Sequence, residues 1–330
     1  MKFGEVTLAK VRGPSDLREL LPEEIVSSET VIVKPNWFSP HQANYTTAEV
    51  LGMLLDALEG RVIVTEAYTL EKHDGSMELT VEGERVGWRW IMEHPDWDWA
   101  LEGAWEELRR QDRWFLDAHG LTETMEDHGA EYLNVTEEVW SGRTANPSKV
   151  KERVEERYAP VRVERLYSCL PSVLETHKGA PLISLGKLKG IGGSYPSLTL
   201  KNLFGLIPDP LRSWWHGPED RHLGESIIDT AKLYASHFDL YGVCEAIREA
   251  TAPNPQGHVE VGWGRYDVIK DLGFAAGGRD LVNLDAVICG LIGVEPSEVS
   301  YLALGEKAFG AYDSDQVERA RMVSGEWIPR

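Results

Sequence analysis

The stretch VIVKPNW, residues 31–37, decides the fold class, because a short run of β-branched residues ends abruptly in a lysine, a proline and an asparagine. Two other β-rich runs flank it, EVTLAKV at 5–11 and RVIVTEA at 61–67, and the segments between them have the leucine spacing of helices. Runs that are apolar on both faces and alternate with helices are typical of a parallel sheet covered on both sides. The sequence therefore predicts a β-α-β-α-β order and an α/β fold.

Polar side chains fall where two of these predicted strands end. Lys34 and Asn36 follow the first apolar run, and Glu66 lies near the end of the next. In open α/β sheets, ligands bind outside the carboxyl ends of the strands. We therefore expect these three side chains at a binding site.

The composition is that of an ordinary soluble globular protein, with 42% hydrophobic and 27% charged residues in 330. Its formal net charge of -20 repels nucleic acid and anionic membranes, so neither is expected as a partner. No segment reaches the roughly 18 apolar residues of a membrane helix, and the start lacks the apolar run of a signal peptide. We expect a cytoplasmic protein whose partner is a small anionic molecule, and homo-oligomer formation stays open.

The cysteines give no indication of a cofactor. Cys169, Cys244 and Cys289 are far apart and form no C-x-x-C pair. Neither a disulfide framework nor a four-thiolate cluster can be built from such spacing in one chain. We expect buried thiols and no iron–sulfur cluster, and the sequence identifies no other cofactor.

The domain organisation that we predict is two closely packed Rossmann-like lobes with mainly parallel sheets. The N-terminal lobe spans 1–150 and includes a Trp-rich helical insertion at 71–128, and the C-terminal lobe spans 151–330. Within the insertion, PDWDWALEGAWEEL at 95–108 places tryptophans and leucines on one helical face. This insertion either packs its aromatic side chains on the main domain or forms a lid over a ligand.

A lysine- and glycine-rich segment, KLKGIGGSYPSLTLKNLFG at 187–205, follows a predicted buried strand. It places Lys187 and Lys189 beside a run of glycines that includes Gly192 and Gly193, where backbone N–H groups can approach an anion closely. The segment is no Walker loop, because G-x-x-x-x-G-K-[ST] is absent. Its two interpretations are an anion cradle and a turn with solvated lysines.

A further lysine interrupts an apolar run in the same segment. Lys201 stands in SLTLKNLFGL with Asn202 beside it, which repeats the pairing of Lys34 with Asn36. A lysine in such a run must pair, reach solvent or serve a site. Two such pairings predict a common polar cavity, and burial among other cations lowers the pKa of a lysine enough to make it a general base.

Two later stretches add site candidates. RSWWHGPEDRH, 212–222, offers Arg212 as a substrate ligand and His216 as an acid or base that neighbouring tryptophans desolvate. The stretch contains too few convincing ligands to assign a metal. In GGRDLVNLD, 277–285, Asp280 precedes a predicted helix, so it either caps that helix or pairs with a lysine at the site.

Taken together, these motifs resemble the family catalogued as domain of unknown function 362. That family has an early K-P-N, a KLKTH strand end, then T-L-x-x-K-N-L-x-G, and a late G-x-D-x-V-A-x-D. Here the histidine of KLKTH is missing, and so is the ferredoxin-like cysteine-rich module of many relatives, so an electron-transfer role is not implied. The matching residues are Lys34, Pro35, Asn36, Lys187, Leu188, Lys189, Thr199, Leu200, Lys201, Asn202, Gly205, Asp280 and Asp285.

The leading hypothesis is a small-molecule enzyme of the isomerase or lyase type. Lysine-assisted proton transfer would act on a carboxylated or phosphorylated substrate, with Lys201 or Lys34 as base and Glu66 or His216 as its partner. The alternatives are a non-catalytic protein that binds an anion or a cofactor, and a redox accessory protein. The predicted substrate-binding residues are Asn36, Lys187, Lys189, Asn202, Arg212 and Asp280.

Overall fold

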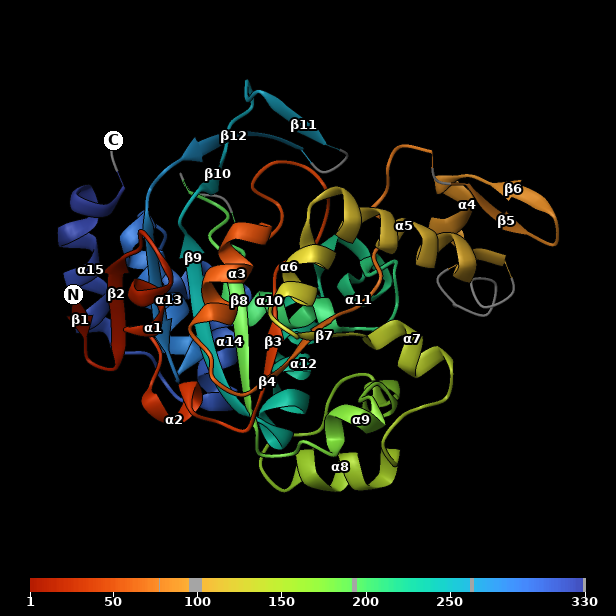
Figure 1. Cartoon of the computed structure of the whole chain (residues 1–330), viewed down its shortest axis with the longest axis horizontal. Helices are drawn as coiled ribbons and strands as arrows, with labels where there is room; N and C mark the ends of the chain where they lie inside the picture. The colour runs from red at the N-terminus through yellow and green to blue at the C-terminus, as the bar shows by residue number, and fades with distance from the viewer. Residues whose placement is uncertain (77, 95–102, 192–194, 262–263, 329–330) are drawn as a thin grey trace.

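The computed structural model describes the whole chain except residues 77, 95–102, 192–194, 262–263 and 329–330. In this described part, an eight-stranded sheet passes through the centre of an α/β molecule (Figure 1). Strands from both halves of the chain contribute to it. In spatial order they are β1 (Lys2–Phe3), β2 (Val6–Lys10), β13 (Phe274–Gly278), β9 (Asp239–Ala246), β8 (Pro181–Lys187), β3 (Thr30–Lys34), β4 (Arg61–Glu66) and β7 (Glu131–Asn134).

The greater part of the sheet is parallel, as the alternation of apolar runs and helices predicts. Strands β9, β8, β3, β4 and β7 pair in parallel, each with its neighbour. The strand at the chain start departs from the prediction, because β2 pairs antiparallel with β13, and β13 pairs antiparallel with β9. Consecutive apolar runs need not become neighbours, and three strands separate β2 from β3.

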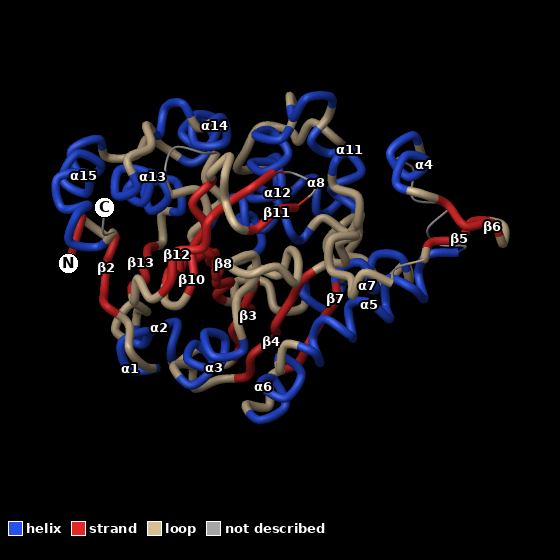
Figure 2. Tube along the Cα trace, turned by 90° about the horizontal axis from the view of Figure 1, so that it is seen from above, coloured by secondary structure: helices blue, strands red, loops and turns tan. Residues whose placement is uncertain are grey.

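Helices cover both faces of the sheet, as Figure 2 shows when the sheet is seen from above. Helices α1, α2, α3 and α6 lie on one face, and α12, α13, α14 and α15 lie on the other. The helix predicted over residues 14–25 is divided in two, because Pro22 interrupts it. The bounds are α1 (Pro14–Arg18), α2 (Glu23–Val26), α3 (Ala48–Asp56), α6 (Leu121–Asp127), α7 (Val135–Trp140), α8 (Pro147–Glu155), α9 (Ser172–Glu175), α10 (Thr199–Leu203), α11 (Ser213–His216), α12 (Leu223–His237), α13 (Leu281–Ile292), α14 (Ser300–Phe309) and α15 (Ser314–Trp327).

The central strand β3 divides its side chains between two hydrophobic cores. Val31 and Val33 belong to the core beneath α1 and α3, whereas Ile32 packs into the core beneath α12 and α13. All three are fully buried. Successive side chains of a strand point to opposite faces, so a sheet covered on both sides requires this continuous apolar run.

The Trp-rich insertion projects from the main body beyond α6 (Figure 1). It contains the hairpin of β5 (Leu79–Val81) and β6 (Glu84–Val86), then α4 (Trp88–Glu93) and α5 (Trp105–Ala118). The first part of the predicted tryptophan helix, residues 95–102, lies outside the described residues. Trp105 ties the start of α5 to the main body, because its indole N–H donates to Glu137 Oε1 at 2.8 Å.

A small antiparallel sheet stands beside the carboxyl ends of the central strands. It consists of β10 (Glu249–Pro253), β12 (Gly264–Lys270) and β11 (Val259–Val261). In the main sheet, β3 pairs directly with β8, so strands from the predicted N- and C-terminal lobes share one sheet. The predicted boundary at residue 150 falls inside α8 and stays a prediction.

Candidate functional site

A cavity of about 630 Å³ lies where β3 and β4 end, with α10 on one side and the small sheet on another. It includes eight of the ten residues predicted for the site, from segments far apart in the chain. Their convergence follows from the parallel sheet, since neighbouring parallel strands end at the same edge. The eight are Lys34, Asn36, Glu66, Lys189, Lys201, Asn202, Arg212 and His216.

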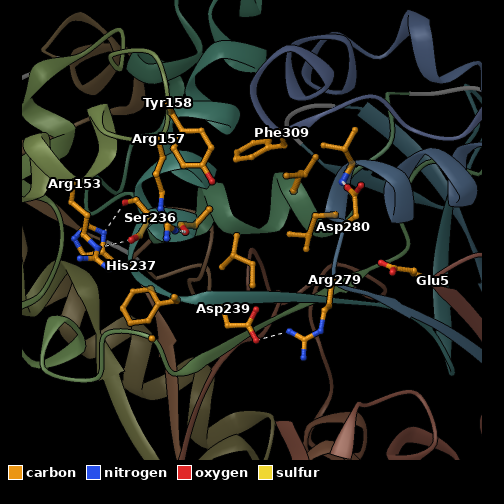
Figure 3. Close-up of a pocket in the computed structure, with 17 residues that line it drawn as sticks. Glu5, Arg153, Arg157, Tyr158, Ser236, His237, Asp239, Arg279, Asp280 and Phe309 are labelled. Atoms are coloured by element: carbon orange, nitrogen blue, oxygen red, sulfur yellow. Dashed lines mark hydrogen bonds and ion pairs between the residues drawn. The ribbon is translucent and has the colours of Figure 1, made fainter. Parts of the chain in front are cut away.

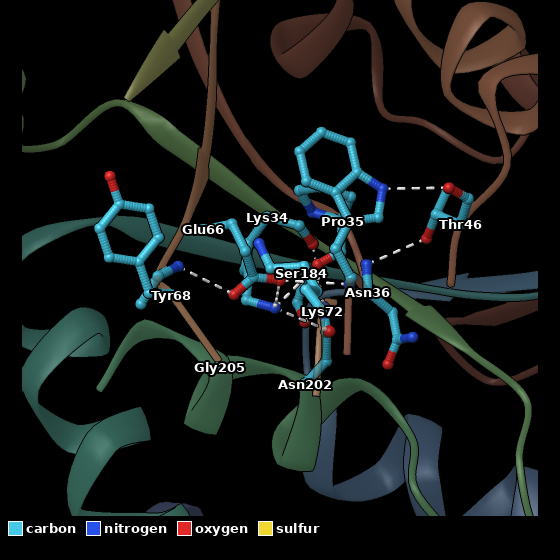
Figure 4. Close-up of polar contacts among 12 residues, drawn as sticks. Lys34, Pro35, Asn36, Thr46, Glu66, Tyr68, Lys72, Ser184, Asn202 and Gly205 are labelled. Atoms are coloured by element: carbon cyan, nitrogen blue, oxygen red, sulfur yellow. Dashed lines mark hydrogen bonds and ion pairs between the residues drawn. The ribbon is translucent and has the colours of Figure 1, made fainter. Parts of the chain in front are cut away.

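Lys34 and Glu66 form a buried ion pair at the base of the cavity (Figure 4). Lys34 Nζ lies 2.9 Å from Glu66 Oε2, and it also donates to Asn202 Oδ1 at 3.1 Å and to the Pro35 carbonyl at 2.8 Å. An ammonium has three N–H donors, so all three are used. Burial lowers the pKa of Lys34 to about 8, although the charge of Glu66 opposes this shift.

The carboxylate of Glu66 is held by the backbone as well as by Lys34. Oε2 accepts the Trp37 N–H and Oε1 accepts the Ala67 N–H, both at 3.1 Å. These hydrogen bonds fix the orientation of the carboxylate, because each oxygen accepts a backbone N–H. Glu66 therefore acts as the fixed counter-ion of Lys34.

Gly205 allows the backbone to approach this ion pair closely. A Cβ at this position would lie 2.5 Å from Lys34 Nζ and 2.8 Å from Glu66 Oε1. Both distances are shorter than any van der Waals contact, so a larger residue must displace the pair. Gly205 was not predicted as a site residue. The glycine that follows KNLF in the family pattern could have indicated it.

Helix α10 carries Lys201 and Asn202, and hydrogen bonds to a neighbouring helix hold its first turn in place. Asp285 of α13 accepts the backbone N–H groups of Thr199 at 3.0 Å and Leu200 at 2.9 Å. Burial raises the pKa of Asp285 to about 7. Asn202 completes the attachment, because its amide donates to the Lys34 carbonyl at 2.9 Å. The side chain of Lys201 therefore starts from a fixed backbone.

Lys189 and Lys201 supply the unneutralised positive charge of the cavity. Neither ammonium has a carboxylate within 4.0 Å among the residues that the structure describes. Burial lowers the pKa of Lys189 to about 7, with Lys201 and Lys34 adding like-charge repulsion, and it lowers the pKa of Lys201 to about 8. Both side chains therefore exchange protons near neutral pH.

Arg212, just before α11, and His216, the last residue of α11, line the same cavity. Arg212 Nη2 donates to the Gly205 carbonyl at 2.8 Å, whereas its Nε is buried without a partner in the described part of the chain. His216 Nδ1 lies 2.8 Å from Asp220 Oδ1, which leaves Nε2 as the ring nitrogen available to a ligand. Burial lowers the pKa of His216, although Asp220 opposes the shift.

Two predicted site residues lie elsewhere. Lys187 is fully buried in an ion pair with Glu245, whose Oε1 is 2.6 Å from Lys187 Nζ. Asp280 caps α13, because its Oδ1 accepts the N–H groups of Val282 and Asn283 at 3.0 Å each. Asp280 lines a second cavity of about 620 Å³ (Figure 3), away from the one that Lys34 and Lys201 line.

The glycine run does not present a free anion cradle in its described part. The N–H of Gly190 donates to the Thr251 carbonyl and hydroxyl at 3.1 Å, and Ile191 N–H donates to the same carbonyl at 2.9 Å. These donors hold the segment against β10. Gly192 and Gly193, which the prediction also used, lie outside the described residues.

Several lining residues were not predicted, and aromatic side chains are prominent among them. Tyr266 of β12 accepts a hydrogen bond from Asn44 Nδ2 at 3.1 Å, and the Asn44 carbonyl in turn accepts from Asn36 at 2.7 Å. Tyr266 is 222 residues from Asn44, so no local pattern could reveal this contact. The tryptophans of α4 and α5 whose side chains are described do not line the cavity.

Comparison with known proteins gives the family. The sequence profile described as Domain of unknown function (DUF362) matches residues 31–290. The chain belongs to this family. The match includes β3, β4, β8, α10 and α13, so every predicted residue of the cavity in this DUF362 protein falls inside it.

The chain is also similar to a curated protein over a shorter segment. A thylakoid-associated protein from Synechocystis sp. is 26% identical over 129 residues, which is 38% of this DUF362 chain and 36% of the relative. The match thus spans about a third of either protein. No solved structure matches the chain.

The described residues show neither a metal cluster nor a membrane-spanning helix. They contain no group of three or more His, Cys, Asp or Glu side chains placed to bind a metal ion. Within the same residues, every helix is too short or too polar to cross a bilayer. All three cysteines are buried, and burial raises the pKa of each thiol.

Proposed function

We propose that this cavity binds a small carboxylated or phosphorylated molecule and that Lys201 moves a proton on it, as in an isomerase or a lyase. The observation that carries the proposal is the pair of half-buried lysines, Lys189 and Lys201, that line the cavity without a carboxylate within 4.0 Å among the described side chains. A low-dielectric wall strengthens their field at a bound anion, despite the acidic composition.

The three lysines of the cavity differ in what they can do. Lys34 is engaged with three acceptors, so its lone pair becomes available only if those hydrogen bonds break. Lys201 has no such partners in the described part of the chain, and its pKa of about 8 leaves a useful fraction of neutral amine near pH 7. A general base works best when its pKa lies near the operating pH. We therefore assign the base to Lys201.

Lys189 and Arg212 are assigned to the anionic group of the substrate. Neutral Lys201 takes a proton from the carbon next to a carbonyl or carboxyl group, and the electron pair of the broken C–H bond moves onto that group. The cations balance this developing negative charge. The protonated fraction of His216 then returns a proton through Nε2, to a different carbon in an isomerisation or to the leaving group in an elimination. Solvent later restores both side chains.

Both halves of the chain are needed for this chemistry. Residues 1–150 supply Lys34 and Glu66, and residues 151–330 supply Lys189, Lys201 and His216. We propose that the halves act as two lobes around the cavity, in line with the Rossmann-like organisation predicted from the sequence. The protein would be cytoplasmic under this proposal, and its partner would be the anion itself.

Proton exchange in D₂O tests the proposal without a known substrate. Purified protein would be incubated with a panel of 2-oxo acids, hydroxy acids and sugar phosphates, and loss of each C–H signal would be followed by proton NMR. We expect exchange with at least one compound, and a loss of at least about a hundredfold in Lys201→Met. Lys307→Met is the matched control, because Lys307 is an exposed lysine of α14 outside the cavity.

Exchange that persists in Lys201→Met would overturn the role of this lysine. If anions bind and Lys201→Met weakens binding, but no compound exchanges, the non-catalytic alternative is the correct one. A coloured purified sample would instead support the redox accessory alternative. Mass spectrometry of small molecules that co-purify with the protein would guide the choice of panel.

A further inference from the structure

Aromatic rings line the cavity together with its cations. Four phenylalanine and tyrosine rings line it in addition to the indole of Trp37, and they come from both halves of the chain. Phe204 and Tyr266 are almost completely buried, whereas Tyr195 at the rim is 40% exposed. Ligand sites commonly combine an apolar wall with a few polar groups that fix orientation. The rings are those of Phe38, Tyr195, Phe204 and Tyr266.

Each free ammonium lies over one of these rings. Lys201 Nζ is 4.9 Å from the centre of the Tyr195 ring, and Lys189 Nζ is 5.6 Å from the centre of the Phe38 ring. Cations within about 6 Å of a ring face are attracted by its quadrupole. The positive charges are therefore held next to aromatic surface, and an anion that meets either ammonium has a ring beside it.

The size of the cavity argues against a bare inorganic anion. At about 30 Å³ for each water molecule, 630 Å³ holds on the order of 20 waters. A phosphate or acetate ion replaces only a few of them, so most of the cavity, including the exposed ring of Tyr195, would stay in contact with water. A ligand with a flat apolar body fills the remaining space and removes that apolar surface from water.

We propose that the ligand is an aromatic carboxylate or phosphate that carries its reacting C–H and carbonyl or carboxyl group on a side chain of the ring, and whose charge meets Lys189 and Lys201 while the ring packs against Tyr195 and Phe204. This inference rests on the proposed function, because it assumes that the cavity is an anion site. It narrows the substrate from any small anion to one with an aromatic body. Arg212 adds a further positive charge to the cavity lining. Its Nε has no hydrogen-bond partner in the described part of the chain and is available to the anion.

Tyr195 is the residue on which the ring contact is tested. Its hydroxyl lies 2.9 Å from Ser300 Oγ, so the ring and the hydroxyl have separable roles. Tyr195→Phe keeps the ring and loses the hydrogen bond, whereas Tyr195→Leu removes the aromatic face and keeps an apolar side chain. Because the side chain is partly exposed, neither change empties a core position.

Calorimetric titration of the full chain with five probes provides the test: 2-naphthoate, cyclohexanecarboxylate, acetate, naphthyl phosphate and inorganic phosphate. We expect 2-naphthoate to bind at least tenfold more tightly than cyclohexanecarboxylate and a hundredfold more tightly than acetate. Tyr195→Leu should lose at least fivefold for 2-naphthoate and less than twofold for acetate and inorganic phosphate. Tyr195→Phe should retain the wild-type preference, and the two naphthyl probes decide between carboxylate and phosphate.

The results separate this inference from the proposed function. Equal affinity for aromatic and non-aromatic anions, with a loss of binding in Lys201→Met, overturns the aromatic ligand and leaves the anion site intact. If none of the five probes binds, both proposals fail. If the aromatic preference persists unchanged in Tyr195→Leu, the assignment of the ring contact is wrong.

Discussion

Lys187 and Glu245 face each other across the parallel pairing of β8 and β9, and Lys187 Nζ lies 2.6 Å from Glu245 Oε1 with both side chains fully buried. The second oxygen of Glu245 accepts the Ile247 N–H at 3.1 Å. This ion pair explains why Lys187 does not contribute to the cavity, although Lys189, two residues later, does. The register between the two strands gives Lys187 a structural partner before any ligand binds.

Removal of one member of this pair should destabilise the fold. We expect Lys187→Met to lower the free energy of unfolding by about 3–5 kcal/mol, because it leaves the Glu245 carboxylate buried and unpaired. The double variant Lys187→Met with Glu245→Leu should recover most of that loss. The control Lys307→Met should change the free energy of unfolding by less than about 0.5 kcal/mol. Urea denaturation measures all three. A loss below roughly 1 kcal/mol in Lys187→Met would contradict the structural role.

Gly205→Ala tests the close packing at the base of the cavity. A methyl group there meets Lys34 Nζ and Glu66 Oε1 at less than 3 Å, so the ion pair must shift. We expect a loss of about 1–3 kcal/mol in the free energy of unfolding, together with weaker anion binding. The measurement pairs denaturant unfolding with calorimetry.

Gly325→Ala is the matched control for this change. Gly325 lies in α15, and a Cβ there meets no atom within 4 Å. In a helix, alanine is more favourable than glycine by about 0.5–1 kcal/mol, so this variant should gain stability and keep its anion affinity. Equal behaviour of the two variants would mean that the backbone approach at Gly205 is unimportant.

The location of the cavity was predictable because it depends on the edge of a parallel sheet. Alternating apolar runs and helices indicate that β3 and β4 are parallel neighbours, and the register places Lys34 and Glu66 at the ends of those strands. The pairing of Lys201 with Asn202 was likewise visible, since a charged residue in an apolar run requires an explanation. These signals are local in sequence.

The other features of the cavity depend on contacts between residues that are distant in sequence. Lys187 resembles Lys189 in sequence, and only the adjacency of β8 to β9 reveals that Glu245 neutralises one and not the other. Tyr266 enters the cavity from a sheet whose position no local pattern specifies. Strand order and long-range register are set by packing of the whole chain, so they were not predictable from any single motif.

Anion affinity should fall as the pH rises from 6 to 9. Lys189, with a pKa of about 7, and Lys201, with a pKa of about 8, lose their positive charge across this range. An ordinary carboxylate probe stays ionised throughout, because its pKa is about 4. Above the pKa of a lysine that must be charged for binding, affinity should decrease by roughly tenfold for each pH unit. Calorimetry with 2-naphthoate at several pH values measures the slope.

The stability of the unliganded protein should change in the opposite direction. An unfolded lysine has a pKa of about 10.4, so between pH 7 and 10 the unfolded chain binds more protons at Lys189 than the folded one. Stability therefore rises with pH over this window as far as this side chain is concerned. Lys189→Met should reduce that rise and flatten the pH dependence of anion affinity, whereas Lys307→Met should leave both unchanged. Parallel pH profiles of wild type and Lys189→Met would show that Lys189 is not buried near the other cations.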